Sequence, residues 1–179
     1  MKKYLKEQNI NISAKTYFID ALGAMAFGLF ASLLVGTILN SIGKSLGITF
    51  LTERIWPLVT AATGPAIAVS IAHGLNAPNL VLFASTIVGM GAYELGGPVG
   101  VYVATIFGVE FAKLVSKRTK LDIIITPAIT ILVGIFVGDL IGPGVAAIMT
   151  GLGDIIMRAT ELQPFLMGII VAVLVGMAL

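Results

Sequence analysis

The stretch MGAYELGGPVGVY, residues 90–102, interrupts a long apolar region of the chain. Glu94 lies there among four glycines and a proline. Glycine is entropically unfavourable inside a helix, and proline removes a backbone hydrogen bond, so this stretch predicts a break between two helices. What the carboxylate does depends on the solvent that surrounds the break.

The composition of the whole chain predicts that lipid surrounds most of it. Of the 179 residues, 58% are hydrophobic and 11% are charged, whereas ordinary globular domains have about 25% charged residues. A water-soluble protein of this size would need a charged exterior. The chain has no cysteine, which excludes disulfides and cysteine metal sites. We expect no cofactor, no metal and no nucleic acid partner.

Several apolar runs approach the length of about 20 residues that a helix needs to cross a bilayer. These runs are 17–42, 56–74, 78–95, 97–115, 123–143 and 163–179. The stretches between them at 43–55 and 144–162 carry more charge, and we expect interfacial or re-entrant segments there. The predicted fold class is an all-α polytopic membrane protein with about six transmembrane helices.

The basic residues predict that the N-terminus is cytoplasmic. One cluster of lysines precedes the first run within 1–16, and a second cluster follows the fourth run at 113–120. Four crossings separate the clusters, so both can lie on the same side, which the positive-inside rule makes the cytoplasm. Residues 1–16 are then a basic cytoplasmic segment. The remaining basic residues are Lys44, Arg54 and Arg158.

Small residues recur at every fourth position in most of the runs, which is typical of closely packed membrane helices. One such stripe is Gly100, Ala104, Gly108 and Ala112. A shift of 102 positions places Gly28, Ser32 and Gly36 on Thr130, Gly134 and Gly138. The pattern predicts a parallel internal repeat, as some transporters have. Because the second copy stops early, we expect 1–179 to be a single membrane-embedded domain that is an incomplete transporter unit.

Polar side chains within or beside the apolar runs are candidates for a substrate site, because polar groups at membrane depth are costly. The candidate substrate-binding residues are Glu94, His73, Asn76, Asn79, Gly96, Gly97, Asp139 and Glu110. Simpler explanations compete with function. Glu110 can form an ion pair with Lys113, Asp139 lies near a span boundary, and a histidine at a helix end is often a cap.

Glu94 is the strongest of these candidates. A carboxylate at a broken membrane helix can accept hydrogen bonds from sugar hydroxyls or hold a cation. The alternative is an ordinary tight turn in water. A second break, HGLNAPNL at residues 73–80, lies on the expected inner side, where Asn76 and Asn79 offer amide donors and acceptors.

Two motifs, GMGAYELGGPVGVYVA and GPAIAVSIAHGLNAPNLVLFAS, resemble the membrane-component (IIC-like) family of the phosphoenolpyruvate-dependent sugar phosphotransferase system. They are most similar to the branch that includes regulators of the perfringolysin-regulator type. The resemblance implies a homodimer in the bacterial inner membrane that binds and translocates a sugar. It also implies a separate cytoplasmic phosphocarrier subunit that phosphorylates the sugar.

The chain has no self-contained catalytic site in its sequence. Phosphotransfer of this kind needs a cysteine or histidine acceptor, and the chain has no cysteine and one histidine. It also has no P-loop. We therefore expect the phosphoryl donor to be another protein that docks on the basic inner face near 113–120.

Two other functions remain open. A secondary transporter of another small solute or ion would use Glu94, Glu110 or Asp139 as a titrating or cation-binding group. A membrane regulator would bind a ligand without moving it.

Overall fold

The computed structural model of the chain describes residues 10, 13–118, 121–162 and 168. Within these residues the chain is helical apart from short turns and contains no strand. Four helical runs are long and apolar enough to cross a membrane: Thr16–Leu46, Phe50–Gly74, Asn79–Val115 and Asp122–Ile155. The predicted all-α membrane class is confirmed. The expected run 163–179, apart from residue 168, lies outside the described residues, as does most of 1–16.

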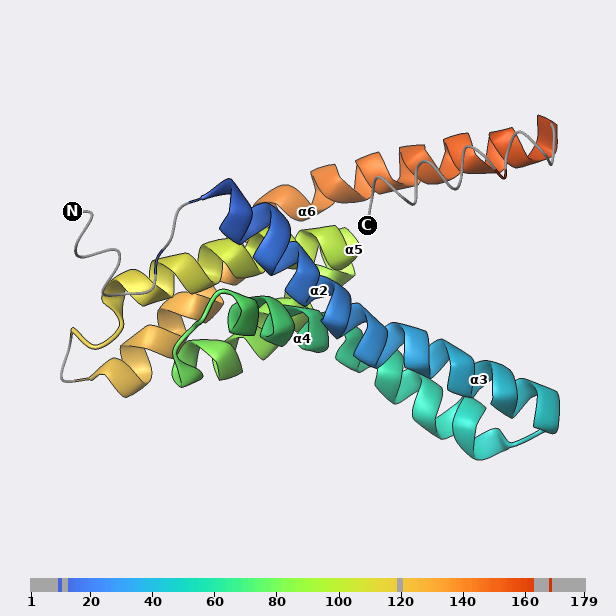
Figure 1. Ribbon diagram of the computed structural model, residues 1–179, viewed down its shortest axis with the longest axis horizontal. Coiled ribbons are helices and arrows are strands. Elements are labelled where there is room, and N and C mark those ends of the chain that lie inside the picture. Colours follow the sequence, from blue (N-terminus) through green and yellow to red (C-terminus); the bar gives the residue numbers. More distant parts are fainter. Residues whose placement is uncertain (1–9, 11–12, 119–120, 163–167, 169–179) are drawn as a thin grey trace.

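The first two helical runs form a hairpin (Figure 1). The first consists of η1 (Thr16–Ala21), α2 (Leu22–Leu29), η2 (Phe30–Leu34) and α3 (Val35–Leu46), and the second of η3 (Phe50–Ile55) and α4 (Trp56–Gly74). Gly47 ends α3 with a φ of 68°, and the Ile48 amide donates to the Gly43 carbonyl at 2.9 Å. This is a common way to end a helix. Residues 43–55 therefore form the tip of the hairpin instead of a separate interfacial or re-entrant element.

The third run, α5 (Asn79–Val115), consists of two antiparallel helices. Gly97 has φ 57° and ψ −154°, a conformation that is essentially restricted to glycine. A Cβ atom placed on Gly138 would lie 3.2 Å from the Ala92 Cβ and 3.6 Å from the Ala104 Cβ. In one continuous helix these alanines would be about 18 Å apart. The predicted break is therefore confirmed as a full reversal of direction at Gly97, which we call the α5 reversal.

The fourth run, α6 (Asp122–Leu162), stays helical through Pro127 and Pro143. Residues 144–162, expected as a separate element, instead continue the helix that begins at Asp122. Membrane helices tolerate internal prolines because neighbouring groups satisfy the backbone carbonyls that proline leaves without a donor. The composition of 144–162 therefore does not mark a helix boundary.

Close backbone contacts hold the runs together. A Cβ on Gly64 in α4 would lie 2.3 Å from the Gly89 carbonyl oxygen in α5, and one on Gly108 would lie 2.9 Å from the Thr130 carbonyl oxygen in α6. The predicted stripe of small residues is buried at all four positions, Gly100, Ala104, Gly108 and Ala112. α4 and the two halves of α5 therefore form the core, with α6 packed against α5 and α2 against α4.

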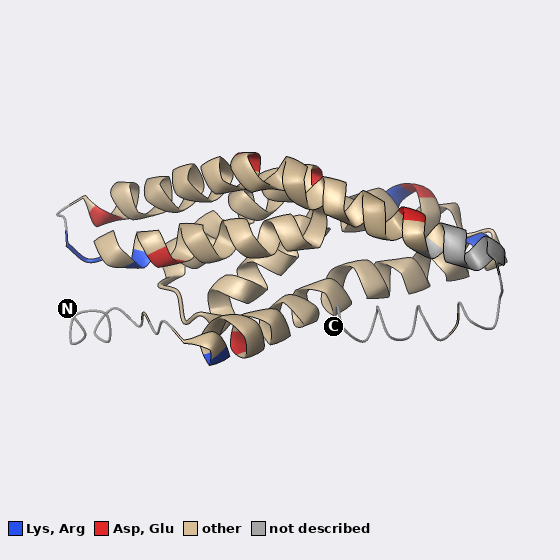
Figure 2. Ribbon diagram, turned by 90° about the horizontal axis from the view of Figure 1, so that it is seen from above, with Lys and Arg blue, Asp and Glu red and all other residues tan. Residues whose placement is uncertain are grey.

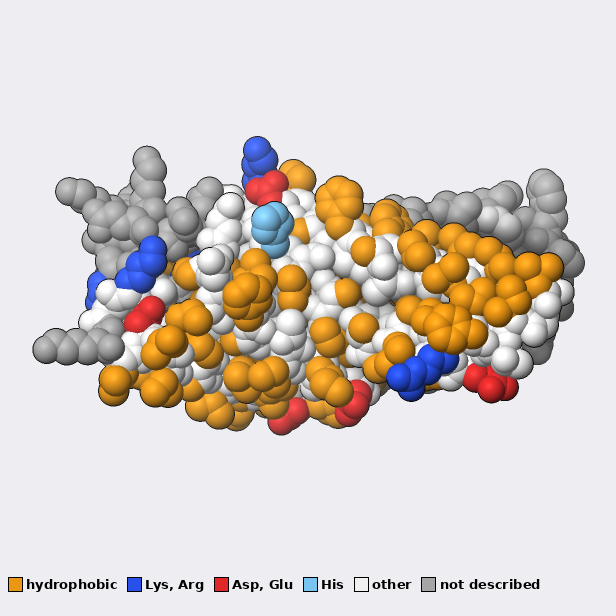
Figure 3. All heavy atoms as spheres, turned by 90° about the horizontal axis from the view of Figure 1, so that it is seen from below, with side chains coloured by type: hydrophobic (Ala, Val, Ile, Leu, Met, Phe, Trp, Pro, Cys, Tyr) orange, Lys and Arg blue, Asp and Glu red, His pale blue; other side chains and the backbone are white. Residues whose placement is uncertain are grey.

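Large apolar side chains cover the outer flanks of the bundle. Phe27 is 74% exposed and Leu132 is 68% exposed. Figure 3 shows apolar side chains spread over one face, and Figure 2 shows few charged positions along the helices between the two ends. Such a surface suits a hydrocarbon solvent, in which exposed apolar side chains carry no penalty.

Candidate functional site

The two ends of the molecule differ in chemistry. We call the end that carries the turns after Gly74 and Val115 the Lys113 end, and the end that carries the α3–η3 turn the Gly47 end. The α5 reversal points toward the Gly47 end but stops short of the tips of α3 and α6 (Figure 1). The sequence candidates divide between the α5 reversal and the Lys113 end.

A groove of about 460 Å³ lies beside the α5 reversal. It is lined by Glu94, Leu95, Gly96, Gly97, Pro98, Val99, Ala146, Met149 and Thr150. Three of the sequence candidates therefore share one concave surface between α5 and α6. The volume falls within the range of about 300–1,000 Å³ that is usual for small-molecule sites.

The local sequence explains the shape and chemistry of this groove. Gly96 allows α6 to approach closely, because a Cβ there would lie 3.2 Å from the Gly142 Cα. The ends of the two α5 helices present their last carbonyls and first amides near the reversal. Glu94 is exposed beside them. The groove therefore combines an apolar wall with a carboxylate and backbone polar groups.

The depth of the α5 reversal follows from contacts between neighbouring helices. A Cβ on Gly36 would touch the Val59 side chain, and one on Gly64 would touch Gly89 and Tyr93. The α5 reversal lies about one helical turn beyond Tyr93 in the direction of the Gly47 end. It therefore lies at about the same depth in the bundle as Val59 in α4 and Gly36 in α3. Both α3 and α6 continue well beyond this level.

Lys113 joins α4 and α5 at the opposite end. Its side chain is 1% exposed, and its Nζ donates to the Leu75 carbonyl at 2.5 Å and to Glu110 Oε1 at 3.2 Å. The Glu110 side chain is 14% exposed. The ion pair between Glu110 and Lys113, which the sequence predicted as an alternative to a substrate-binding role for Glu110, is therefore present. Among the described residues, Glu110 Oε2 is buried without a hydrogen-bond partner.

The inner break HGLNAPNL is a helix end followed by a short turn. Asn76 adopts a φ of 53°, and the Ala77 amide donates to the Ala72 carbonyl at 3.0 Å, a pattern typical of helix C-termini. Asn76 is exposed on this turn, and Asn79 is exposed at the start of α5. His73 is exposed in the last turn of α4, where it lies beside Ala24 and Phe27. The separation along α5 between Asn79 and Glu94 is about 22 Å, so these residues and Glu94 belong to different sites.

Asp139 belongs to neither group. It is exposed on α6, next to Gly138, which packs against Ala92. It does not line the groove beside Glu94.

The structure corrects one expectation about Lys113. The sequence placed Lys113 on an exposed basic face for a docking partner, but the side chain is buried. Lys113 lies on the same buried side of α5 as Thr105 and Val109. This four-residue spacing is the sequence pattern that indicates its burial. Lys117 and Arg118 are exposed at the same end.

Sequence reasoning also missed a contact between the first run and α5. The Tyr102 hydroxyl donates to the Tyr17 carbonyl at 2.6 Å. Nothing in the spacing of these residues points to the contact, because it depends on how η1 crosses α5.

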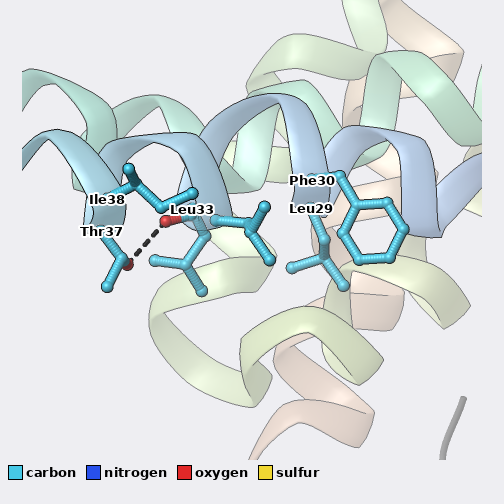
Figure 4. Close-up of a pocket in the computed structure, with 6 residues that line it drawn as sticks. Leu29, Phe30, Leu33, Thr37 and Ile38 are labelled. Carbon is cyan, nitrogen blue, oxygen red and sulfur yellow. Dashed lines mark hydrogen bonds between the residues drawn. The ribbon is translucent and has the colours of Figure 1, made fainter.

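A second groove, of about 430 Å³, runs along the first helical run (Figure 4). It is lined by Leu29, Phe30, Leu33, Leu34, Thr37 and Ile38. The Thr37 hydroxyl donates to the Leu33 carbonyl at 2.7 Å, which leaves an apolar surface. Such a surface suits a lipid tail or a helix and does not suit a sugar.

The fold and the apolar flanks define a multi-pass membrane protein. A family model described as phosphotransferase system, EIIC, matches residues 19–179, and the chain belongs to this family. It is therefore a permease component of a phosphotransferase system. Membership of this family implies a sugar substrate and cytoplasmic phosphotransfer partners. No curated protein and no solved structure matches the chain.

Proposed function

We propose that this chain binds a sugar in the groove beside Glu94 and translocates it for phosphorylation by a separate cytoplasmic phosphocarrier subunit. The observation that supports this most directly is the exposed Glu94 carboxylate on the wall of a groove of substrate size. A carboxylate can accept two hydroxyl hydrogen bonds at once. Leu95, Pro98 and Met149 supply apolar surface for the C–H groups of a sugar ring.

The depth of Glu94 strengthens this proposal. No charged residue lies between Asp20 and Lys44, and at about 1.5 Å per residue this stretch exceeds the hydrocarbon core of about 30 Å. The α5 reversal lies near the level of Gly36, within that stretch. A bilayer that covers the stretch also covers Glu94. A carboxylate at that depth is a functional candidate by default, because solvation there must come from protein, ligand or a wet cavity.

We further propose that the Lys113 end faces the cytoplasm of a bacterium and that the protein acts as a homodimer in the inner membrane. Support for the orientation comes from the exposed Lys15, Lys117 and Arg118 at this end. Lys117 and Arg118 are exposed and would then lie on the side from which an acidic or phosphorylated protein partner approaches.

The binding test compares wild type with Glu94→Gln in purified full-length protein. A thermal-shift screen of hexoses, N-acetylhexosamines and disaccharides identifies the sugar, because a ligand raises apparent stability. We expect Glu94→Gln to weaken binding about ten- to a hundredfold, since it removes a charge-assisted hydrogen bond. The matched control is Glu53→Gln, an exposed glutamate outside the groove. Unchanged affinity in Glu94→Gln would exclude Glu94 from the site.

Uptake separates the three functions that the sequence left open. Accumulation of sugar phosphate that depends on phosphoenolpyruvate is expected for the permease. Accumulation of unmodified solute driven by a proton or sodium gradient would indicate a secondary transporter. Binding without uptake would indicate a regulator.

The orientation test uses single cysteines, since the chain has none of its own. Ala14→Cys and Arg118→Cys probe the Lys113 end, and Thr49→Cys probes the Gly47 end; all three positions are exposed. An impermeant maleimide should label only the Thr49→Cys protein in intact cells. Labelling of either of the other two from outside would reverse the proposed orientation.

A further inference from the structure

Lys113 is the most deeply buried charged side chain among the described residues, and its partner is a backbone carbonyl of another helix. Its Nζ lies 2.5 Å from the Leu75 carbonyl oxygen, at the C-terminal end of α4. The last carbonyls of a helix lack intrahelical donors and carry partial negative charge. The Lys113 ammonium supplies the missing donor and a positive charge next to the partial negative charge of the carbonyl. Glu110 Oε1, at 3.2 Å from Nζ, neutralises the lysine charge.

This contact connects two exposed turns. On one side, Leu75 begins the turn that presents Asn76 and leads to Asn79, the first residue of α5. On the other side, Lys113 lies one helical turn before Ser116 and the exposed Lys117. The Lys117 amide is in turn tied to the start of α6, because it donates to Asp122 Oδ1 at 2.7 Å.

We propose that Lys113 is a positioning residue that holds these two turns as one platform for the phosphoryl-carrying partner. The platform consists of Asn76 and Asn79, which flank the α4–α5 connection, and of Lys117 and Arg118, which follow the C-terminal end of α5. Its amides and cations suit a phosphorylated or acidic protein surface. This inference rests on the proposed function and on the cytoplasmic orientation of the Lys113 end.

The variants must separate the Lys113–Leu75 bond from the ion pair. Lys113→Met alone leaves Glu110 buried without its cation, which can prevent folding. The double variant Lys113→Met with Glu110→Gln removes both charges and keeps similar volumes. Glu110→Gln alone is the matched control, because Lys113 keeps its bond to the Leu75 carbonyl and the glutamine amide oxygen remains a hydrogen-bond acceptor for its ammonium.

Hydrogen exchange measures the position of the turn directly. The amides of Leu75, Asn76 and Ala77 all donate to backbone carbonyls of α4. We expect these amides to exchange about tenfold faster in the double variant than in Glu110→Gln, because the turn loses a charge-assisted bond. The Ile48 amide, bonded to Gly43 at the other end, should exchange at equal rates in both proteins. Equal exchange of residues 75–77 would overturn the positioning role.

Phosphorylation kinetics test the platform. Inverted membrane vesicles receive phosphoenolpyruvate and cytosolic extract of the same cells as phosphoryl donor, and the extract concentration is varied. The double variant should need about tenfold more extract for half-maximal rate than Glu110→Gln, with an unchanged KM for the sugar. A changed sugar KM with an unchanged extract requirement would overturn the proposal. No phosphorylation by wild type would overturn the proposed function, while the exchange experiment would still test whether Lys113 holds the turn.

Discussion

Glu94 and Lys113 are both charged side chains of α5, one beside its reversal and the other near its C-terminal end. Lys113 is buried and donates to a backbone carbonyl and a carboxylate, whereas Glu94 is exposed on a groove wall. Burial with protein partners makes a charge part of the architecture, and its removal should act on stability. Exposure on a concave surface leaves a charge available to a ligand, and its removal should act on binding.

The largest effect on stability is expected at the Lys113 end. Lys113→Met should lower the free energy of unfolding by about 3–5 kcal/mol, because Glu110 would remain buried without its cation. Adding Glu110→Gln should recover a large part of this loss. Unfolding of the purified protein in detergent measures both values. Equal stability of the single and double variants would mean that burial of the Glu110 carboxylate does not require the Lys113 cation. Lys113 would then not differ from Glu94 in its contribution to stability.

The next effect concerns the packing between the two ends. Gly108→Leu should destabilise the fold by about 1–3 kcal/mol or more, because overpacking forces neighbouring backbones apart. A Cβ at Gly108 already lies 2.9 Å from the Thr130 carbonyl oxygen and 3.2 Å from the Gly134 Cα. The control is Gly23→Leu in α2, where no atom lies within 4 Å of a Cβ. Melting temperatures in detergent should separate the two variants, and similar values would place Gly108 on a lipid-facing surface.

The sequence predicted the features that depend on local chemistry. The glycines and Pro98 beside Glu94 identify the break in α5, because the backbone preferences of these residues act at their own positions. The same reasoning failed at 43–55 and 144–162. Charges there suggested separate elements, but a charged residue does not end a helix. Within 43–55 the chain reverses at Gly47, which adopts a positive φ, and 144–162 continues α6.

Long-range partners explain the rest of the difference between sequence and structure. The burial of Lys113 depends on the Leu75 carbonyl, which comes from another helix, and a backbone acceptor leaves no sequence signal. The groove beside Glu94 depends on α6, which reaches the reversal through Gly142. The candidates at the α5 reversal and at 73–80 could be named from the sequence, but their separation into two sites required the fold.

The smallest effect is expected for the hydrogen bond that links the first run to α5. Tyr102→Phe removes the hydroxyl that donates to the Tyr17 carbonyl at 2.6 Å. Such bonds contribute about 0.5–1.5 kcal/mol in water-soluble proteins and average about 0.6 kcal/mol within a membrane. We expect a loss near the lower value, because the Tyr17 carbonyl lies within a helix and the ring still packs against the core.

Tyr93→Phe makes the same chemical change in the first half of α5 and serves as the control for Tyr102→Phe. Unfolding in detergent, measured in parallel for both variants, gives the contribution of the Tyr102 hydroxyl as a difference. A loss above about 2 kcal/mol would exceed the range for one neutral hydrogen bond. The contact of η1 with α5 would then stabilise the fold as strongly as a charged contact such as that of Lys113. The part of α5 that is fixed by other helices would then reach from the Lys113 end to Tyr102.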